Sequence, residues 1–272
     1  MICAAHSGGT ERYMKQITST DNAEIKLLKK LEKKKGRAET GLFLVEGLRA
    51  CELAAGSPAG VDTFYLSDSF LERQTGAQPF WESFPCRRVS DRVFAFVAGT
   101  DTPQGILCSA KIPERAALGG RRYVYLDRVR DPGNVGTIIR TADALGFDGV
   151  LLSKGCADLY SPKVVRATMG SVFTIGAAVD CAVSTLAELK ERGFLICASA
   201  LSETCMDVYR AQWGERLVFV LGNEANGVSS EVLALADCAV KIPMYGGAES
   251  FNVSIAAALL MGEAARREYE KR

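Results

Sequence analysis

The sequence predicts an α/β fold in two domains, the second of which is built on a parallel sheet. Short apolar segments such as "YVYLD" and "LVFVLG" alternate with helical segments over the second half of the chain. These segments are apolar at successive positions, as in strands that helices cover on both faces. The 272 residues also exceed the usual size of one domain. We therefore expect a leader without a packed role at 1–13, a smaller α/β domain at 14–112, a linker at 113–120 and the parallel-sheet domain at 121–272.

The smaller domain begins with a lysine-rich helix. In residues 21–36, Ile25, Leu28 and Leu31 recur at helical spacing and form an apolar stripe. Four lysines share another face of this helix: Lys26, Lys30, Lys33 and Lys34. Alternating apolar patterns then predict strands at 41–47, 61–67 and 104–112, and helices at 48–56 and 90–99.

The C-terminal domain repeats the alternation with more strongly apolar strands. Strands are predicted at 123–127, 149–153, 173–179, 194–200, 217–222 and 238–243, and helices at 185–193 and 229–237. After the first strand, Asn134 is the predicted N-cap of a helix that stops at Gly146. In parallel sheets ligands bind at the carboxyl ends of the strands, so the loops at that edge are the candidate site.

Composition excludes several classes of protein. His6 is the only histidine, which disfavours an imidazole base or a histidine-bound metal, and we expect no metal. The nine cysteines show no CxxC spacing and indicate reduced thiols. No apolar run approaches the roughly 20 residues that span a bilayer, and the first residues lack a signal-peptide core, so we expect a cytoplasmic protein.

The charge is uneven along the chain. Between Met14 and Thr40, eight lysines and arginines outnumber four acidic residues, although the whole chain carries a net charge of only +1. One interpretation is a solvated helix face. The other is a surface that follows the phosphates of a nucleic acid, which needs independent support.

Three loops at strand ends carry unusual polar residues. In "DPGNVGTIIR", Gly136 precedes Arg140 by four positions, so both lie on one helix face and an incoming group has room beside the guanidinium. A structural ion pair of Arg140 with Asp143 or Glu224 is the alternative. The other two loops are "LGNEANGVS" and "IPMYGGAESFN". The GxGxxG and GxxxxGK[ST] patterns are absent, which disfavours dinucleotide and P-loop sites.

Together these residues resemble the SpoU/TrmH family of the SPOUT superfamily. The matching patterns are NxGxxxR from Asn134, LGxExxG from Leu221, and IPMxG with ESxNVSxAAA from Ile242. The segment "SPKVVRATMGSVF" also resembles the family, and "ETGLFLVEGLR" resembles its appended substrate-binding domain, which is ribosomal-protein-like (L30e-like). Phe251 departs from the leucine that the family more often carries and remains apolar.

The resemblance implies an RNA ribose 2'-O-methyltransferase that uses S-adenosylmethionine, has a deep trefoil knot and forms a homodimer through its C-terminal domain. It implies catalytic roles for Arg140, Asn134, Glu224, Ser250 and Asn252. It implies cofactor binding by Ser199, Ala200, Leu201, Gly222, Asn223, Gly227, Ile242, Met244 and Phe251. We expect RNA contacts by Lys29, Lys30, Lys33, Lys34, Arg37 and Arg166.

Arginine stays protonated, so we expect Arg140 to orient the ribose and stabilise developing negative charge, with Asn134 and Glu224 holding it in place. The expected substrate is ribosomal RNA, most specifically 23S, with transfer RNA as the runner-up. Two other interpretations are an inactive RNA-binding relative and an unrelated α/β enzyme acting on a small molecule. An inactive relative is disfavoured because none of the matched polar residues is missing.

Overall fold

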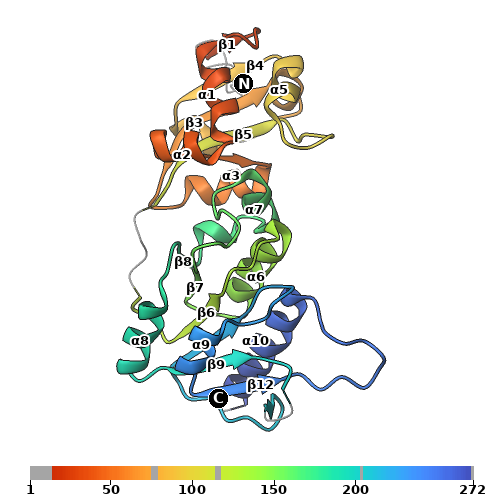
Figure 1. Cartoon of the computed structure of the whole chain (residues 1–272). Helices are drawn as coiled ribbons and strands as arrows, with labels where there is room; N and C mark the ends of the chain where they lie inside the picture. Colours follow the sequence, from red (N-terminus) through yellow and green to blue (C-terminus); the bar gives the residue numbers. More distant parts are fainter. Residues whose placement is uncertain (1–13, 75–78, 114–117, 203–204, 271–272) are drawn as a thin grey trace, which may run out of the picture. The chain divides into compact units, whose positions relative to one another are not determined.

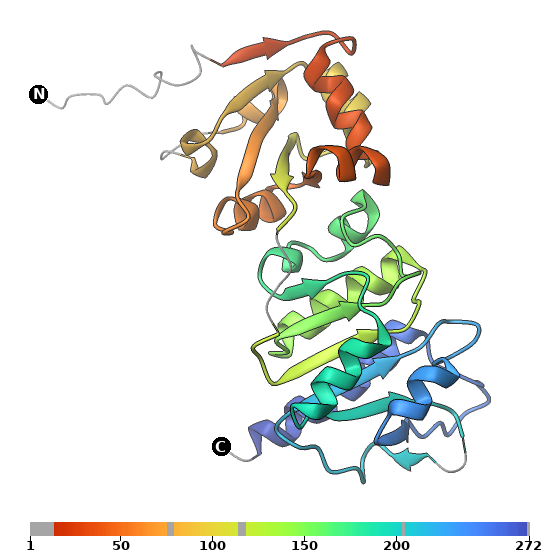
Figure 2. The same cartoon turned by 60° about the vertical axis from the view of Figure 1, so that its left-hand side comes forward.

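The structure is a computed structural model that describes residues 14–74, 79–113, 118–202 and 205–270. The predicted leader at 1–13, including His6, lies outside the described residues, and so does half of the predicted linker. The chain forms two compact units: residues 1–114 with 160–166, and residues 115–159 with 167–272. Figures 1 and 2 show their elements. In the described chain no helix is long and apolar enough to cross a membrane.

The N-terminal unit is built on a mixed five-stranded sheet of order β1-β4-β3-β5-β2. Strand β5 pairs antiparallel with β2 and β3, whereas β4 pairs parallel with β1 and β3. Its strands are β1 (Lys15–Ile17), β2 (Leu42–Glu46), β3 (Val61–Ser67), β4 (Cys86–Val89) and β5 (Ile106–Lys111). Its helical elements are α1 (Ala23–Leu31), α2 (Lys34–Thr40), α3 (Leu48–Ala55), α4 (Asp68–Glu72), η2 (Phe80–Ser83), α5 (Asp91–Val97) and most of α7 (Pro162–Ala167).

Helices cover both faces of this sheet. The stripe of Ile25, Leu28 and Leu31 is fully buried, as predicted, in a cluster with Val93 and Phe94 of α5. Helix α3 packs on the other face, against β2 and β5. The three predicted strands and the helices at 48–56 and 90–99 are confirmed to within two residues at each end.

The single lysine helix predicted over 21–36 is wrong, because the chain breaks into α1 and α2 after Leu31. A Cβ at Gly36 would lie 2.1 Å from the carbonyl oxygen of Lys30, so α2 crosses the end of α1 in close backbone contact. The buried guanidinium of Arg37 donates to the Leu31 carbonyl at 2.6 Å. That bond satisfies one of the carbonyls left open at a helix C-terminus.

The C-terminal unit is built on a parallel seven-stranded sheet of order β10-β12-β9-β11-β6-β7-β8. Its strands are β6 (Arg122–Leu126), β7 (Gly149–Leu152), β8 (Gly176–Ala178), β9 (Leu195–Ser199), β10 (Met206–Asp207), β11 (Leu217–Leu221) and β12 (Cys238–Lys241). Its helices are α6 (Pro132–Ala144), η3 (Ser171–Phe173), α8 (Val183–Glu191), α9 (Ser230–Leu235) and α10 (Val253–Tyr269). All six predicted strands are present, so the parallel-sheet prediction is confirmed.

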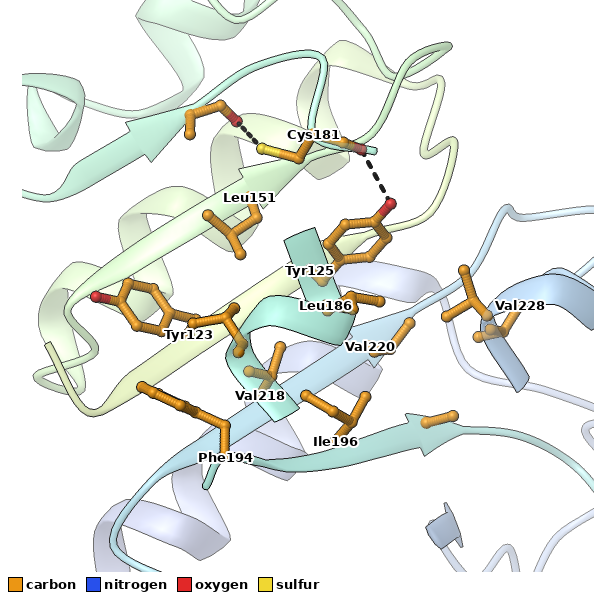
Figure 3. Close-up of a cluster of buried hydrophobic side chains, with 14 residues drawn as sticks. Tyr123, Tyr125, Leu151, Cys181, Leu186, Phe194, Ile196, Val218, Val220 and Val228 are labelled. Atoms are coloured by element: carbon orange, nitrogen blue, oxygen red, sulfur yellow. Dashed lines mark hydrogen bonds between the residues drawn. The ribbon is translucent and has the colours of Figure 1, made fainter. Parts of the chain in front are cut away.

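Two pairs of helices sandwich this sheet. On one face, α8 and α9 bury Leu186 and Val232 against the strand residues Tyr125, Val218 and Val220 (Figure 3). On the other face, α6 and α10 pack on each other, and α10 also contacts β11. The chain therefore returns from β12, near one edge of the sheet, to place α10 beside α6.

The N-terminus of α6 differs from the prediction. Asp131, not Asn134, is the N-cap, and its side chain accepts from the backbone N–H of Asn134 at 2.8 Å. Pro132 occupies the first helical position, where its missing N–H costs nothing. The helix ends as predicted before Gly146, which has a φ of 70°. Because Asp131 provides the cap, the side chain of Asn134 is free to bond Glu224 and Asn252.

Candidate active site

A cleft of about 740 Å³ opens at the carboxyl ends of three adjacent strands, β9, β11 and β12. Its walls come from residues 199–202 after β9, 221–228 after β11 and 249–253 before α10. Ile242, Leu233 and Ala256 complete the lining. The second and third of the three loops singled out in the sequence thus meet at this cleft, joined by the loop after β9.

Most residues predicted to bind the cofactor line this cleft. They are Ser199, Ala200, Leu201, Gly222, Asn223, Gly227, Ile242 and Phe251. Met244 does not, because the chain leaves the cleft after Ile242 and returns to it at Glu249. The predicted catalytic residues Glu224, Ser250 and Asn252 also line the cleft, whereas Asn134 and Arg140 lie outside its lining.

Gly222 sets the shape of the loop after β11. A Cβ at this position would lie 2.0 Å from the backbone carbon of Gly227 and 2.1 Å from the nitrogen of Val228. The loop is folded back on itself there by two backbone bonds between Asn223 and Gly227, of 3.0 and 2.9 Å. Glycine is therefore the residue that permits this close backbone approach at the cleft wall.

Asn134 connects the three loops by hydrogen bonds. Its Nδ2 donates to Glu224 Oε1 at 3.1 Å, and its Oδ1 accepts from Asn252 Nδ2 at 3.0 Å. Asn252 in turn caps α10, because its Oδ1 accepts from the backbone N–H of Ser254 at 2.9 Å. The side-chain amides of two asparagines thus join the first loop to the second and third.

Glu224 is held in its ionised form. Burial raises its pKa, but hydrogen bonds from its own backbone, from the Asn134 side chain and from the backbone N–H groups of Asp131 and Arg130 more than compensate, so its pKa is lowered. The two backbone bonds measure 3.3 and 3.4 Å. The carboxylate therefore serves as an anchor for the start of α6.

Arg140 is exposed on α6 and makes no hydrogen bond or ion pair with any residue that the structure describes. The alternative partners are engaged elsewhere: Asp143 accepts from Thr174 Oγ1 at 2.7 Å, and Glu224 bonds Asn134. The expectation that Asn134 and Glu224 hold Arg140 is wrong for this structure, since they bond each other. The structural ion-pair interpretation of Arg140 is not supported either.

Asp127 was missed in the sequence although it ends a strand at the same sheet edge. The residue is 4% exposed, and its carboxylate accepts from the backbone N–H of Ser229 at 2.7 Å and from Arg128 Nε at 3.0 Å. Asn223 Nδ2 donates to the carbonyl of Arg128 at 2.8 Å. The first two loops are therefore also linked beneath the cleft.

The predicted RNA-contacting residues are divided by the structure. Lys33 and Lys34 are exposed and have no ion pair among the described residues, whereas Lys29 pairs with Glu32 and Lys30 with Glu39. Arg37 is 3% exposed and cannot reach a nucleic acid, because its side chain fills the junction of α1 and α2. Arg166 forms an ion pair with Glu46 at 3.4 Å and remains partly exposed.

Among the described residues, no group of three or more His, Cys, Asp or Glu side chains is arranged to hold a metal ion.

Two family models match the chain. The SpoU rRNA Methylase family matches residues 121–262, and the MRM3-like substrate binding domain matches residues 22–108. The first match spans the whole cleft and α6, and the second spans most of the N-terminal sheet.

Relatives with known names match over nearly the whole chain. The 23S rRNA (guanosine(2553)-2'-O)-methyltransferase RlmP of Bacillus subtilis is 37% identical over 91% of this chain and 98% of its own length. The 23S rRNA (uridine(2479)-2'-O)-methyltransferase of Streptomyces viridochromogenes is 30% identical over 87% of this chain and 86% of its own. The AdoMet-bound rRNA methyltransferase of Sinorhizobium meliloti has a similar structure, with a TM-score of 0.81, 32% identity, and coverage of 94% and 98%. This chain therefore belongs to the SpoU rRNA methylase family.

Proposed function

We propose that this enzyme transfers a methyl group from S-adenosylmethionine to a ribose 2'-hydroxyl of ribosomal RNA. The observation that carries the proposal is that the second and third motifs of the family line one cleft, and that Asn134 of the first motif is hydrogen-bonded to a residue of each. The named relatives act on 23S rRNA, which makes that RNA the first choice of substrate.

The cleft fits S-adenosylmethionine. Its volume of about 740 Å³ lies within the range of small-molecule sites. Leu221, Val228 and Ile242 provide apolar walls suited to an adenine ring, and Gly222 keeps side-chain atoms away from the folded-back loop. When bound, the cofactor supplies an electrophilic methyl group on a sulfonium centre. Two structural relatives were crystallised with AdoMet.

The residues of the chain have separate tasks in this proposal. Asn134, Glu224 and Asn252 fix the three loops relative to one another, so that the ribose and the methyl donor meet in line; such placement can supply roughly 7–11 kcal/mol. Ser250 lines the cleft in the loop before α10. Its proposed task is to contact the ribose. Arg140 stabilises the negative charge that develops on the 2'-oxygen, and the proton of the hydroxyl passes to solvent water.

The assembly and the topology complete the proposal. We propose that the C-terminal domain is folded as a trefoil knot, and the return of the chain from β12 to place α10 beside α6 supports this. We assign the homodimer interface to the C-terminal unit. The RNA contacts outside the cleft are assigned to Lys29, Lys30, Lys33, Lys34 and Arg166. The proposed localisation is the cytoplasm, where ribosomal RNA is found. We assign residues 14–112 to the substrate-binding domain and 121–272 to the methyltransferase domain, of which residues 160–166 pack with the N-terminal unit.

A direct assay tests the reaction and the substrate class. Radiolabelled S-adenosylmethionine is incubated with the enzyme and with 23S rRNA or total transfer RNA from a strain lacking the gene. The expected product is a single 2'-O-methylated nucleotide in 23S rRNA, identified by digestion and mass spectrometry. Label in transfer RNA alone would show that transfer RNA, not 23S rRNA, is the substrate. Label in neither RNA would support the inactive-relative interpretation.

A further inference from the structure

Phe96 is an exposed aromatic side chain on the N-terminal unit. It is 48% exposed, whereas the other aromatic residues described in this unit are buried or half-buried. Phe80, Trp81 and Phe84, for example, pack against other aromatic rings. The exposure follows from the register of α5. Val93, Phe94 and Val97 point into the core, which leaves Phe96 on the outer side of the helix.

One cationic side chain contacts this ring, and a second shares its helix face. Lys29 of the neighbouring α1 places its Nζ 5.0 Å from the ring centroid and donates to the carbonyl of Phe96 at 3.2 Å. Arg92 lies one helical turn before Phe96 and is therefore on the same face of α5. Figures 1 and 2 both show α1 and α5 side by side, and residues of the two helices share one core cluster.

Some of these cations are available to a ligand. Lys29 pairs with Glu32, so its positive charge is partly neutralised and attracts an incoming phosphate less strongly. Lys33, Lys34 and Arg92 are exposed and have no ion pair within the described part of the chain. Lys33 and Lys34 directly follow the last turn of α1, in which Lys29 lies. We call Phe96 with Lys29, Lys33, Lys34 and Arg92 the Phe96 surface.

We propose that the Phe96 surface binds an unpaired segment of RNA, with one base stacked on the Phe96 ring and neighbouring phosphates at Lys33, Lys34 and Arg92. The proposal rests on the proposed function in that the RNA is the substrate. An aromatic platform next to cations is how proteins hold single-stranded RNA, because every base has a face that stacks. A protein partner is disfavoured by the charge, which complements a polyanion.

The binding test uses the full chain and a fluorescent 12-nucleotide oligouridine, with a blunt-ended RNA duplex of 12 base pairs for comparison. Phe96→Leu removes the aromatic ring, and we expect it to weaken oligouridine binding about tenfold or more without changing the salt dependence. Phe96→Tyr retains a ring and should bind like the parent. Replacing Lys33 and Lys34 by Gln should instead flatten the salt dependence, since fewer counterions are released.

Leu48→Ala is the matched control. Leu48 is 41% exposed on α3, which covers the opposite face of the sheet, so its loss should leave RNA binding unchanged. If Phe96→Leu binds oligouridine as tightly as the parent, the stacking proposal is wrong. The same follows if the parent prefers the duplex, since a stacked base must be unpaired.

A second measurement reports contact directly. Phe96→Trp introduces a fluorophore at the surface, and stacking of a base should quench its emission in proportion to bound oligouridine. The parent, with its buried Trp81 and half-buried Trp213, supplies the background. Equal quenching in both proteins would overturn the proposal. Failure of the proposed function is seen separately, as absence of methyl transfer by the parent on any RNA while oligouridine binding persists.

Discussion

Arg140 is a guanidinium without an ionic partner on an otherwise well-packed helix. Among the described residues it makes no hydrogen bond, so truncating it removes no contact that stabilises the fold. We predict that Arg140→Ala and Arg140→Lys bind S-adenosylmethionine nearly normally, because the cleft is lined by other residues. Lysine keeps the charge but lacks the planar fork that holds hydroxyl and phosphate together. Single-turnover methyl transfer should therefore fall on the order of 100-fold or more in both variants. A parental rate in Arg140→Ala would remove Arg140 from the mechanism.

Asp127 is a positioning residue in this scheme, because it holds the loop after β11 through the Ser229 backbone and has no place in the cleft lining. Asp127→Asn keeps the volume but replaces one acceptor oxygen by a donor. We predict a weaker cofactor affinity, roughly tenfold, from loss of a buried charged hydrogen bond. Calorimetry with S-adenosylmethionine measures it. Asp143→Asn, which alters a side chain bonded to Thr174 instead, is the control and should bind normally.

The sequence predicted single residues best where a motif concentrates polar groups at a strand end. Asn134, Glu224 and Asn252 meet as the motifs imply. Asp127 was missed because a lone acidic residue after a strand is also an ordinary strand end. Arg37 was misassigned because composition counts charges and cannot show that a guanidinium is buried against a helix terminus.

At the scale of elements, the fold was predictable wherever a strand is apolar on both faces. Strand β4 ("CRRV") was missed because two of its four residues are arginines, and β1 and β10 because they have three and two residues. The break between α1 and α2 was missed because lysine repeats continue helical periodicity across it. Tertiary contact of Gly36 with Lys30 decided that boundary.

The loop after β11 provides the test at this scale. Gly222→Ala would place a methyl group 2.0 Å from backbone, which no side-chain rotation can relieve. We predict a large loss of cofactor affinity and a destabilisation of about 1–3 kcal/mol from overpacking. Thermal unfolding and calorimetry measure the two effects. Gly246→Ala is the control, because open space surrounds that position; equal behaviour of the two variants would show that the loop adapts freely.

At the scale of the whole molecule, one face of α10 packs inside the C-terminal unit, and another face is exposed and could contact a second chain. The small residues Ala257 and Ala264 of α10 are buried within the C-terminal unit, whereas Ala256, Ala258 and Ala265 are half-buried. Ile255 and Leu259, one turn apart, are instead 50% and 37% exposed, and Phe251 just before the helix is 41% exposed. Apolar side chains aligned in this way are typical of an interface core.

The proposed homodimer makes this apolar strip a self-complementary contact, since a two-fold axis brings the same patch of both chains together. We predict that the parent sediments as a dimer at micromolar concentration and that the double substitution Ile255→Asp with Leu259→Asp shifts it to monomer, because the new charges would be desolvated in the interface. Tyr269→Asp is the control: Tyr269 is 79% exposed at the far end of α10 and lies outside the strip, so this variant should remain dimeric. Sedimentation velocity distinguishes the species, and calorimetry with S-adenosylmethionine confirms that each variant retains its cleft. A monomeric parent would contradict the dimer, and a dimeric double variant would place the interface elsewhere on the C-terminal unit.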